Sequence, residues 1–278
     1  MRRLLISFVL LIVASSALFF IGVPMLERRM TFHPDKYDAR HPWQLPADTA
    51  DVFFPTADGV RLHGWSYTAT TPRNGITVLL LHGNGGDLTG VKGDALYLQK
   101  HGFDVLAIDY RGYGKSEGES RDEVTLKLDG DAAMRYLTAG RGVDAANIAL
   151  LGQSLGTTVA AEISVSWPCR AVTLIAPLAS ARQQAADVLP YVPSFLYRAM
   201  HSQLDTVGKI GRANCPVLIV HGERDGTIAF HQGRAVYEAA RSPKKFIDVP
   251  QGGHWLPLAD DTAYTGTVVS LFAAGRLD

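Results

Sequence analysis

The stretch IALLGQSLGTTVAAEISVSWP, residues 148–168, places a serine where a strand-like pattern changes into a helical one. Its first four residues are apolar, and a helical run follows the serine to the end of the stretch. Ser154 stands between the two, with Gly152 and Gly156 two residues to either side. GxSxG between a strand and a helix is typical of a nucleophile elbow, where larger side chains would collide with the crossing strand and helix. We therefore predict that Ser154 is a nucleophile, although an isolated serine is usually a surface or capping group.

A serine nucleophile needs a base that takes its proton during attack and returns it to the leaving group. His254, within QGGHW, is the candidate because it follows the last expected strand, Lys245 to Val249. That position agrees with the chain order serine, acid, histidine. Other histidines suit plainer roles: His33 and His41 fall in an expected connector, and His63 is expected at the sheet edge.

The acid should follow a strand end between the serine and the histidine, because it orients the imidazole and stabilises its cation. The run HGERDGTI, residues 221–228, offers two carboxylates there, Glu223 and Asp225. Asp225 is favoured because it precedes Gly226 at the expected apex of the loop. Its alternative role is an N-cap for a helix that starts near Ile228.

The oxyanion of an acyl-transfer reaction needs two aligned N–H donors. One is expected from Leu155, which follows the nucleophile at a helix N-terminus, and the other from Asn84 in the loop HGNGG, residues 82–86. Such a Gly-rich loop could instead hold a phosphate, but it lacks the Lys-Ser/Thr ending of a P-loop. We therefore predict that it forms part of an oxyanion hole.

The fold class follows from short apolar runs that alternate with helical spacing. An antiparallel hairpin at a sheet edge is expected from Asp51 to Pro55 and Arg61 to Tyr67. Later runs suit strands buried on both faces of a parallel sheet: Ile76 to Leu81, Phe103 to Ile108, Ile148 to Leu151, Val172 to Ile175, Val217 to Val220 and Lys245 to Val249. The pattern predicts an α/β fold with a mostly parallel doubly wound sheet, whose ligands bind at the carboxyl ends of the strands.

One helix between these strands can be outlined further. A capping box of Ser120 and Glu123 is expected to start it, and Gly140 is expected to stop it. Its apolar residues at helical spacing are Val124, Leu128, Ala132 and Leu137.

The N-terminal segment is a predicted membrane anchor. Residues Leu4 to Leu26 contain no charge, and about 20 such residues are enough for a helix to cross the hydrocarbon core. A cleaved signal peptide is the alternative, with small residues at Ser15 and Ala17, but the apolar run continues past them. Basic residues flank both ends, so the side of the membrane stays open. We expect an anchor over 1–29, a connector over 30–50 and a catalytic domain over 51–278.

Composition excludes some function classes. The 278 residues are 47% hydrophobic and 19% charged, with 27 basic and 27 acidic side chains, so no global field attracts nucleic acid. Two cysteines are too few for a four-thiolate zinc site. Cys169 and Cys215 each precede an expected strand, so they are either inert thiols or, if those strands are neighbours, within disulfide reach. A disulfide would favour an oxidising compartment.

These motifs, together with the run DYRGYGKSEG over residues 109–118, make the chain resemble the α/β-hydrolase family from about Val52 onward. Within that family it resembles a membrane-anchored branch that includes protein depalmitoylases. The resemblance implies a triad of Ser154, Asp225 and His254, an oxyanion amide at Asn84, and cleavage of an ester, thioester or peptide without a cofactor or metal. The chain departs from depalmitoylases because it has an apolar span where they have a Cys-rich N-terminus.

The function predicted from the sequence is that of a serine hydrolase acting on small-molecule or lipid-like carboxylic esters or thioesters. A cap over about 180–215 could line an acyl pocket or only pack onto the sheet. Two alternatives stay open: a peptidase that releases N-terminal residues, with Asp187 or Asp205 holding the substrate amine, and a membrane-tethered binding module without turnover. The candidate pocket residues are Val188, Leu189, Tyr191, Val192, Phe195 and Leu196.

Overall fold

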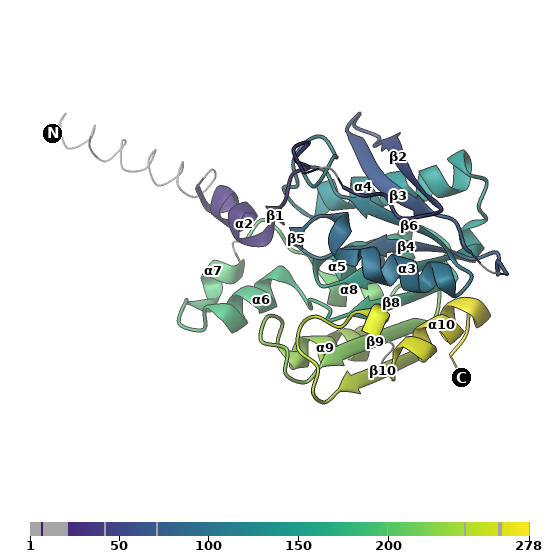
Figure 1. Cartoon of the computed structure of the whole chain (residues 1–278). Helices are drawn as coiled ribbons and strands as arrows, with labels where there is room; N and C mark the ends of the chain where they lie inside the picture. Colours follow the sequence, from purple (N-terminus) through teal and green to yellow (C-terminus); the bar gives the residue numbers. More distant parts are fainter. Residues whose placement is uncertain are drawn as a thin grey trace.

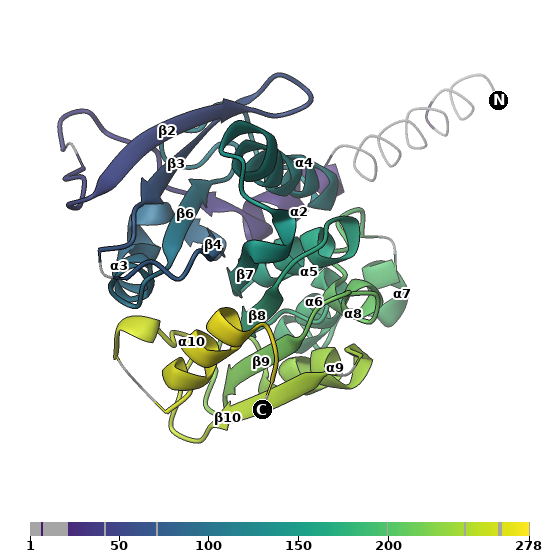
Figure 2. The same ribbon diagram turned by 90° about the vertical axis from the view of Figure 1, so that its right-hand side faces the viewer.

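The computed structural model describes residue 7 and residues 22–277, apart from residues 42, 71, 199, 242, 261 and 262. Its centre is an eight-stranded sheet with the order β10-β9-β8-β7-β4-β6-β3-β2 (Figures 1 and 2). A second, two-stranded sheet pairs β1 with β5. The strand bounds are β1 His33–Pro34, β2 Thr49–Pro55, β3 Arg61–Tyr67, β4 Thr77–Leu81, β5 Gly85–Gly86, β6 Asp104–Asp109, β7 Ile148–Gln153, β8 Ala171–Ile175, β9 Val217–Gly222 and β10 Lys244–Val249.

The sheet is mixed and mostly parallel. Strand β2 pairs antiparallel with β3, and β3 pairs antiparallel with β6, whereas the other neighbouring pairs are parallel. The predicted hairpin and the six predicted strands are therefore confirmed. Strand β4 lies between β6 and β7, so successive strands are added on one side of β4 and then on the other. α/β sheets bind their ligands at the point where the strand order changes in this way.

Helices cover both faces of the sheet. Alternate residues of β4 point to opposite faces: Leu79 and Leu81 join one hydrophobic cluster, and Val78 and Leu80 join the other. The first cluster includes residues of α4, α5, α8 and α9, and the second includes residues of α3 and α10. The helix bounds are α2 Val23–Thr31, α3 Lys92–Lys100, α4 Glu123–Arg135, α5 Leu155–Ser166, α6 Ala181–Val188, α7 Ser194–Arg198, α8 Thr206–Ile210, α9 Phe230–Ala239 and α10 Thr265–Ala274.

Helix α4 differs from its prediction at its start and on its buried face. Asp122, not Ser120, is the N-cap, and it forms a capping box with Thr125. Ser120 instead donates to the Arg111 carbonyl. Val124 is 62% exposed, and the buried face includes Gly130, where an added Cβ would lie 2.9 Å from the Ile163 side chain of α5. Of the predicted apolar face, Ala132 and Leu137 are buried but Val124 is not, because α4 packs closely on α5 through a glycine. A π-helical turn then extends the helix to Gly140.

The prediction that His63 lies at the sheet edge is also wrong. The edge strand is β2, and His63 on β3 is completely buried. Its Nδ1 lies 2.8 Å from Asp109 Oδ2 and its Nε2 lies 3.0 Å from Asp51 Oδ1. Two carboxylates thus hold this histidine between β2 and β6, because a buried polar ring needs partners.

Cys169 and Cys215 form a disulfide with a Cα–Cα distance of 6.0 Å. They precede β8 and β9, which are neighbours in the sheet, so the conditional prediction from the sequence is confirmed. The chain between the two cysteines contains β8, α6, α7 and α8. The bond therefore closes a loop that includes these helices.

Residues 1–6 and 8–21 of the predicted anchor over 1–29 lie outside the described residues, and residues 23–29 belong to α2. No helix within the described ranges is long and apolar enough to cross a membrane. Helix α2 lies against the protein beside α6 and α7 (Figure 1). Glu27 of α2 accepts hydrogen bonds from the backbone N–H groups of His201 and Ser202, which follow α7.

Candidate active site

Ser154 lies in the sharp turn between β7 and α5. Its φ of 51° and ψ of −118° are strained for a residue with a side chain. Cβ atoms added at the flanking glycines would meet backbone: at Gly152 2.5 Å from the Gly156 oxygen, and at Gly156 2.1 Å from the Leu81 oxygen. The turn therefore needs glycine at both positions, as the sequence predicts.

Three predicted residues from three different loops come together at this turn. His254 Nε2 lies 3.1 Å from Ser154 Oγ, and His254 Nδ1 lies 2.8 Å from Asp225 Oδ2. The Asp225 side chain is fully buried, whereas 27% of the His254 side chain is exposed. Glu223, the rejected alternative, is exposed. The geometry is that of a nucleophile, a base and an orienting acid.

Asp225 combines this contact with the capping role considered from its sequence. Its Oδ1 accepts the N–H groups of Thr227 and Ile228, at 2.8 and 2.9 Å. Burial alone would raise the pKa of this carboxyl, but hydrogen bonds from His221, His254 and the two amides lower the pKa well below its usual range. Asp225 is therefore held as a carboxylate facing His254.

His221 is a contact of the acid that sequence reasoning missed. It is the next-to-last residue of β9 and is fully buried. Its Nε2 lies 3.2 Å from Asp225 Oδ2 and 3.0 Å from the Ile228 carbonyl oxygen. Because both partners accept, we assign the proton to Nε2. Its position four residues before Asp225, at the end of a strand, is the pattern that could have indicated it.

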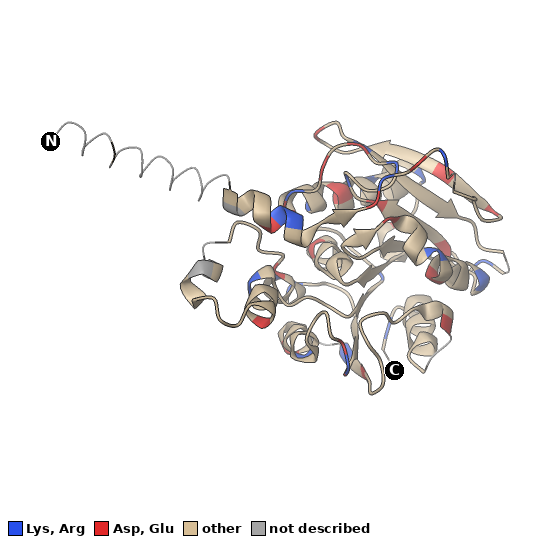
Figure 3. Ribbon diagram, turned by 60° about the vertical axis from the view of Figure 1, so that its left-hand side comes forward, with Lys and Arg blue, Asp and Glu red and all other residues tan. Residues whose placement is uncertain are grey.

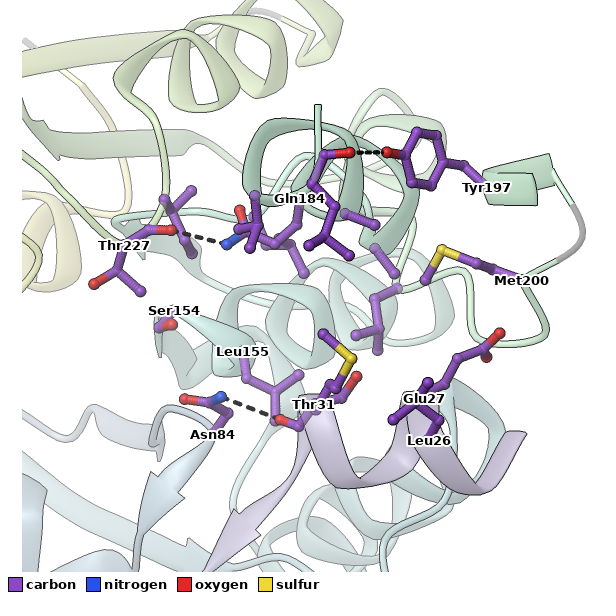
Figure 4. A pocket seen from close by; sticks show the side chains of 18 residues that line it. Leu26, Glu27, Thr31, Asn84, Ser154, Leu155, Gln184, Tyr197, Met200 and Thr227 are labelled. Carbon is purple, nitrogen blue, oxygen red and sulfur yellow. Dashed lines mark hydrogen bonds between the residues drawn. The ribbon is translucent and has the colours of Figure 1, made fainter. Parts of the chain in front are cut away.

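The loop after β4 lies beside Ser154, and aromatic hydroxyls hold it there. Tyr110 donates to the His82 carbonyl at 3.0 Å, and Tyr113 donates to the Asn84 carbonyl at 2.8 Å. Burial raises the pKa of both tyrosines, so they remain donors. The Asn84 side chain donates to the Thr31 carbonyl at the end of α2 (Figure 4).

The two predicted oxyanion donors flank the serine. Leu155 is the first residue of α5, so its N–H has no partner within the helix. Asn84 lines both cavities next to Ser154, and its side chain turns away toward Thr31. The loop backbone passes close to the serine, because a Cβ added at Gly83 would lie 3.4 Å from Ser154 Cβ. Their role in stabilising an oxyanion stays a prediction.

Asp94 of α3 links two parts of the site and was not indicated by the sequence. Its Oδ2 accepts a hydrogen bond from Gln153, which precedes the nucleophile, and its Oδ1 accepts the Leu258 N–H at 2.7 Å. Leu258 lies on the chain segment that carries His254. Burial raises the pKa of Asp94, against the effect of these hydrogen bonds. This carboxyl therefore ties the elbow to the histidine loop.

Two cavities meet at Ser154. The larger, of about 320 Å³, lies between α2 and the helices after β8 (Figure 4). The smaller, of about 160 Å³, is lined by the 82–91 loop, His254 and Trp255. The larger cavity is mostly apolar, and its lining residues are Leu26, Glu27, Met30, Thr31, Asn84, Ser154, Leu155, Leu178, Ala181, Gln184, Ala185, Val188, Leu189, Tyr197, Met200, Leu204, Thr227 and Ile228.

Only part of the expected pocket lining is found in this cavity. Val188 and Leu189 line it, but Tyr191, Val192 and Phe195 do not, and the Leu196 side chain falls outside the described residues. Of the predicted wall residues, those at the end of α6 are therefore placed in the cavity. The wall formed by α2 was not predicted, because it joins segments about 160 residues apart in the chain.

The acidic groups proposed for a peptidase lie elsewhere. Asp187 accepts from Gln183 and Gln232, and Asp205 caps α8 through the Gly208 N–H; neither lines the two cavities. Among the described residues, no cluster of three or more His, Cys, Asp or Glu could hold a metal ion.

The chain belongs to the α/β-hydrolase family. A family model described as serine aminopeptidase, S33, matches residues 72–207. The chain is 32% identical over 253 residues to protein Rv2307c of Mycobacterium tuberculosis, covering 91% of this chain and 88% of that protein. It is 32% identical over 213 residues to human alpha/beta hydrolase domain-containing protein 17C, covering 76% of this chain and 62% of that protein.

Solved structures of similar fold include esterases. An esterase from Pyrococcus furiosus has a TM-score of 0.70 at 20% identity, covering 88% of this chain and 97% of that chain. Acetyl xylan esterase 1 from Thermoanaerobacterium has a TM-score of 0.66 at 18% identity, covering 91% of each chain. At these identities the likeness establishes the α/β-hydrolase fold.

Proposed function

We propose that this chain is a serine hydrolase that cleaves carboxylic ester or thioester bonds through an acyl-enzyme on Ser154. The observation that carries the proposal is the hydrogen-bonded chain from Ser154 through His254 to the buried Asp225 carboxylate. The esterases of similar fold agree with this reaction type. The reaction needs no cofactor, because the three side chains supply nucleophile, base and orienting charge.

In the first half-reaction, Ser154 Oγ attacks the carbonyl carbon while His254 Nε2 takes the hydroxyl proton. The carbonyl oxygen becomes an oxyanion, which the N–H groups of Leu155 and Asn84 stabilise. The bond to the leaving oxygen or sulfur then breaks, and His254 passes its proton to that atom. An alcohol or thiol departs, and the acyl group remains on Ser154.

In the second half-reaction, water attacks the acyl-enzyme. His254 takes a proton from the water, and the bond from the acyl carbon to Ser154 Oγ breaks. The same proton returns to Ser154 Oγ, which releases the carboxylic acid and regenerates the enzyme. Asp225 keeps the imidazole in the required orientation and stabilises its cation in both steps.

The larger cavity supports an acyl group as the apolar part of the substrate. Its walls are mainly aliphatic, and it opens beside Ser154. A small-molecule or lipid-like ester is therefore the proposed substrate class, with the leaving group in the smaller cavity next to His254.

A peptidase is the second candidate because the matching family model is described as a serine aminopeptidase. Recognition of a substrate amine needs a carboxylate in the pocket, and Glu27 lies on the wall of the larger cavity. However, Glu27 already accepts N–H groups of His201 and Ser202. Preferred hydrolysis of an aminoacyl amide over an ester would favour this second function.

We also propose that the uncharged run Leu4 to Leu26 anchors the protein in a membrane, because its length matches the hydrocarbon core. The disulfide supports a location of the catalytic domain on an oxidising side. Retention in the membrane fraction after alkaline carbonate washing tests the anchor. Release of the protein by that wash would refute it.

The test of the catalytic proposal uses full-length protein and a panel of p-nitrophenyl esters, an acyl thioester and an aminoacyl amide. Ser154→Ala should remove turnover and labelling by a fluorophosphonate probe, while the circular dichroism spectrum stays that of the wild type. Undiminished turnover in Ser154→Ala would refute the acyl-enzyme. Absence of both labelling and turnover in the wild type would point to a binding module.

A further inference from the structure

An exposed apolar rim surrounds the opening of the larger cavity. Eleven large hydrophobic side chains of the described residues are exposed, and seven of them belong to α2 or to residues 188–195. Exposed apolar residues scattered singly need no explanation, but a contiguous group marks an interaction surface. The rim consists of Met25, Leu26, Met30, Val188, Leu189, Tyr191 and Phe195.

Four rim residues also line the cavity: Leu26, Met30, Val188 and Leu189. Their exposed fractions are 58%, 53%, 56% and 41%, so each side chain has one side toward the cavity and another toward solvent. These residues therefore form the mouth through which an apolar substrate reaches Ser154. The remaining rim residues extend the apolar surface outward, and Tyr191 is 98% exposed.

Two of the three charged residues of α2 bind to the protein, whereas Arg29 is exposed. Glu27 binds backbone N–H groups after α7, and Arg28 forms an ion pair with Glu119 at 2.9 Å. Residues 188–197 contain no Asp, Glu, Lys or Arg. Figure 3 shows no charged ribbon in the first turn of α2 or in the loop between α6 and α7. The cavity mouth is therefore apolar along both segments that form it, the first turn of α2 and residues 188–197.

The α2 part of the rim lies at the end of the proposed membrane anchor in the chain, and this position indicates which partner covers the rim. The uncharged run Leu4 to Leu26 ends within α2, and its last residue is itself part of the cavity wall. A helix rises about 1.5 Å per residue, so Met30 lies roughly 6 Å beyond Leu26 along α2. If this run crosses the bilayer, the rim lies within the depth of the lipid headgroups and upper acyl chains.

We infer that the rim docks on the lipid bilayer, so that the larger cavity receives the acyl chain of its substrate directly from the membrane. The inference rests on the proposed function, because it assigns a substrate source to the same catalytic site. The partner is a lipid surface, and the substrate is an acyl ester or thioester that partitions into it. Helix α2 then acts both as the end of the anchor and as a wall of the substrate pocket.

The first test measures contact with lipid directly. Tyr191→Cys is labelled with the environment-sensitive fluorophore NBD in full-length protein, whose two natural cysteines are joined in a disulfide. On reconstitution into phosphatidylcholine vesicles, the emission of NBD at position 191 should shift to shorter wavelength. The reference is an NBD-labelled peptide in water without detergent. Leu45→Cys, 43% exposed and close to Ala47 at the other end of the sheet, should keep an aqueous spectrum.

The second test separates the inference from the proposed function. Tyr191→Ser/Phe195→Ser changes two rim residues that do not line the cavity. It should lower the rate on a long-chain fluorogenic ester embedded in the vesicles about tenfold or more, and change the rate on water-soluble p-nitrophenyl acetate less than about twofold. Leu45→Ser should change neither rate.

The outcomes are distinct. If wild-type protein hydrolyses neither ester, the proposed function fails. If wild type hydrolyses both and the rim variant behaves like wild type on both, the inference alone fails. The blue shift at position 191 could also increase with protein concentration while the area of contact between protein and lipid stays constant. That result assigns the rim to a second copy of the chain and also overturns the inference. Retained activity on p-nitrophenyl acetate shows that the rim variant is folded.

Discussion

At the scale of single residues, the hydrogen-bonded arrangement of Ser154, His254 and Asp225 was predictable, because each of the three residues occupies a position that a sequence rule describes. Ser154 has glycines two residues away, Asp225 and His254 follow strand ends, and their chain order is that of the family. Asp94 was not predictable, because its partners Gln153 and Leu258 lie in distant segments. His221 was missed although it lies only four residues before Asp225, because nothing local shows that its ring is buried against that carboxylate. A buried polar residue reveals its purpose only when its partners are known.

The glycine at position 156 is a structural requirement that can be measured. A Cβ there would lie 2.1 Å from the Leu81 carbonyl oxygen. The backbone of β4 cannot move away without disturbing the sheet. Gly156→Ala should therefore destabilise the fold by about 3 kcal/mol or more, or prevent folding. Urea denaturation measures the change. Gly266→Ala, in α10 with nothing within 4 Å of the added Cβ, should be neutral or slightly stabilising.

Asp225 should be needed as a charge and not only as a shape. Asp225→Asn keeps the size of the side chain but disturbs the tautomer of His254, so kcat should fall by about 10⁴. The matched control is Glu223→Gln in the same loop, which should keep nearly full activity because Glu223 is exposed. A comparable loss in both variants would contradict the assignment of the acid.

The same carboxyl makes a prediction about stability and pH. Because its pKa is lowered in the folded state, its ionisation stabilises the fold at every pH above its unfolded pKa, about 3.9. That contribution is lost as the pH falls from there through the lower folded pKa. The free energy of unfolding of wild type minus that of Asp225→Asn should be constant from pH 7 to about pH 5 and shrink below about pH 4. A difference that already shrinks at pH 6 would exclude this linkage.

At the scale of elements, strands were predicted better than helix faces. The parallel strands are buried on both sides, so an apolar run marks them directly. The buried face of α4 contains Gly130 and Asp129, which hydropathy places on the outside. Asp129 is buried because Arg111 Nε donates to it at 2.8 Å, and Gly130 because α5 packs closely there. Both causes lie in other elements.

The carboxyl of Asp94 joins α3, the end of β7 and the histidine loop, so its removal should misplace two catalytic residues relative to each other. Asp94→Ala should lower kcat about tenfold or more and change KM little, because the cavities keep their lining. Asp94→Asn should retain most activity. Gln153 Oε1 has no partner among the described atoms, so a turned Gln153 amide can accept from the new amide. Equal losses in both variants would show that charge, and not the connection, matters.

At the scale of the whole molecule, the sequence could state the disulfide only as a condition. Cys169 and Cys215 are 46 residues apart, and their bond depends on β8 and β9 being neighbours. The packing of α2 against residues after α7 had no counterpart in any local pattern. Contacts between segments so distant depend on the completed fold, which explains why the wall of the larger cavity was not predicted.

The disulfide should stabilise the protein by restricting its unfolded chain. For a loop of this length the chain-entropy model gives about 4 kcal/mol. Cys169→Ala/Cys215→Ala should therefore lose up to that amount in urea denaturation, and wild type in excess dithiothreitol should behave like the double variant. Unchanged stability in both cases would mean that the bond adds nothing to the fold.

The meeting of two cavities at Ser154 has a consequence for the fate of the acyl-enzyme. In the proposed reaction, the acyl chain fills the larger cavity while the departed leaving group empties the smaller one beside His254. Whatever enters that chamber next decides the product. Water yields a free acid, whereas a small alcohol that fits against Trp255 yields a new ester, so the chamber sets the partition between hydrolysis and transacylation.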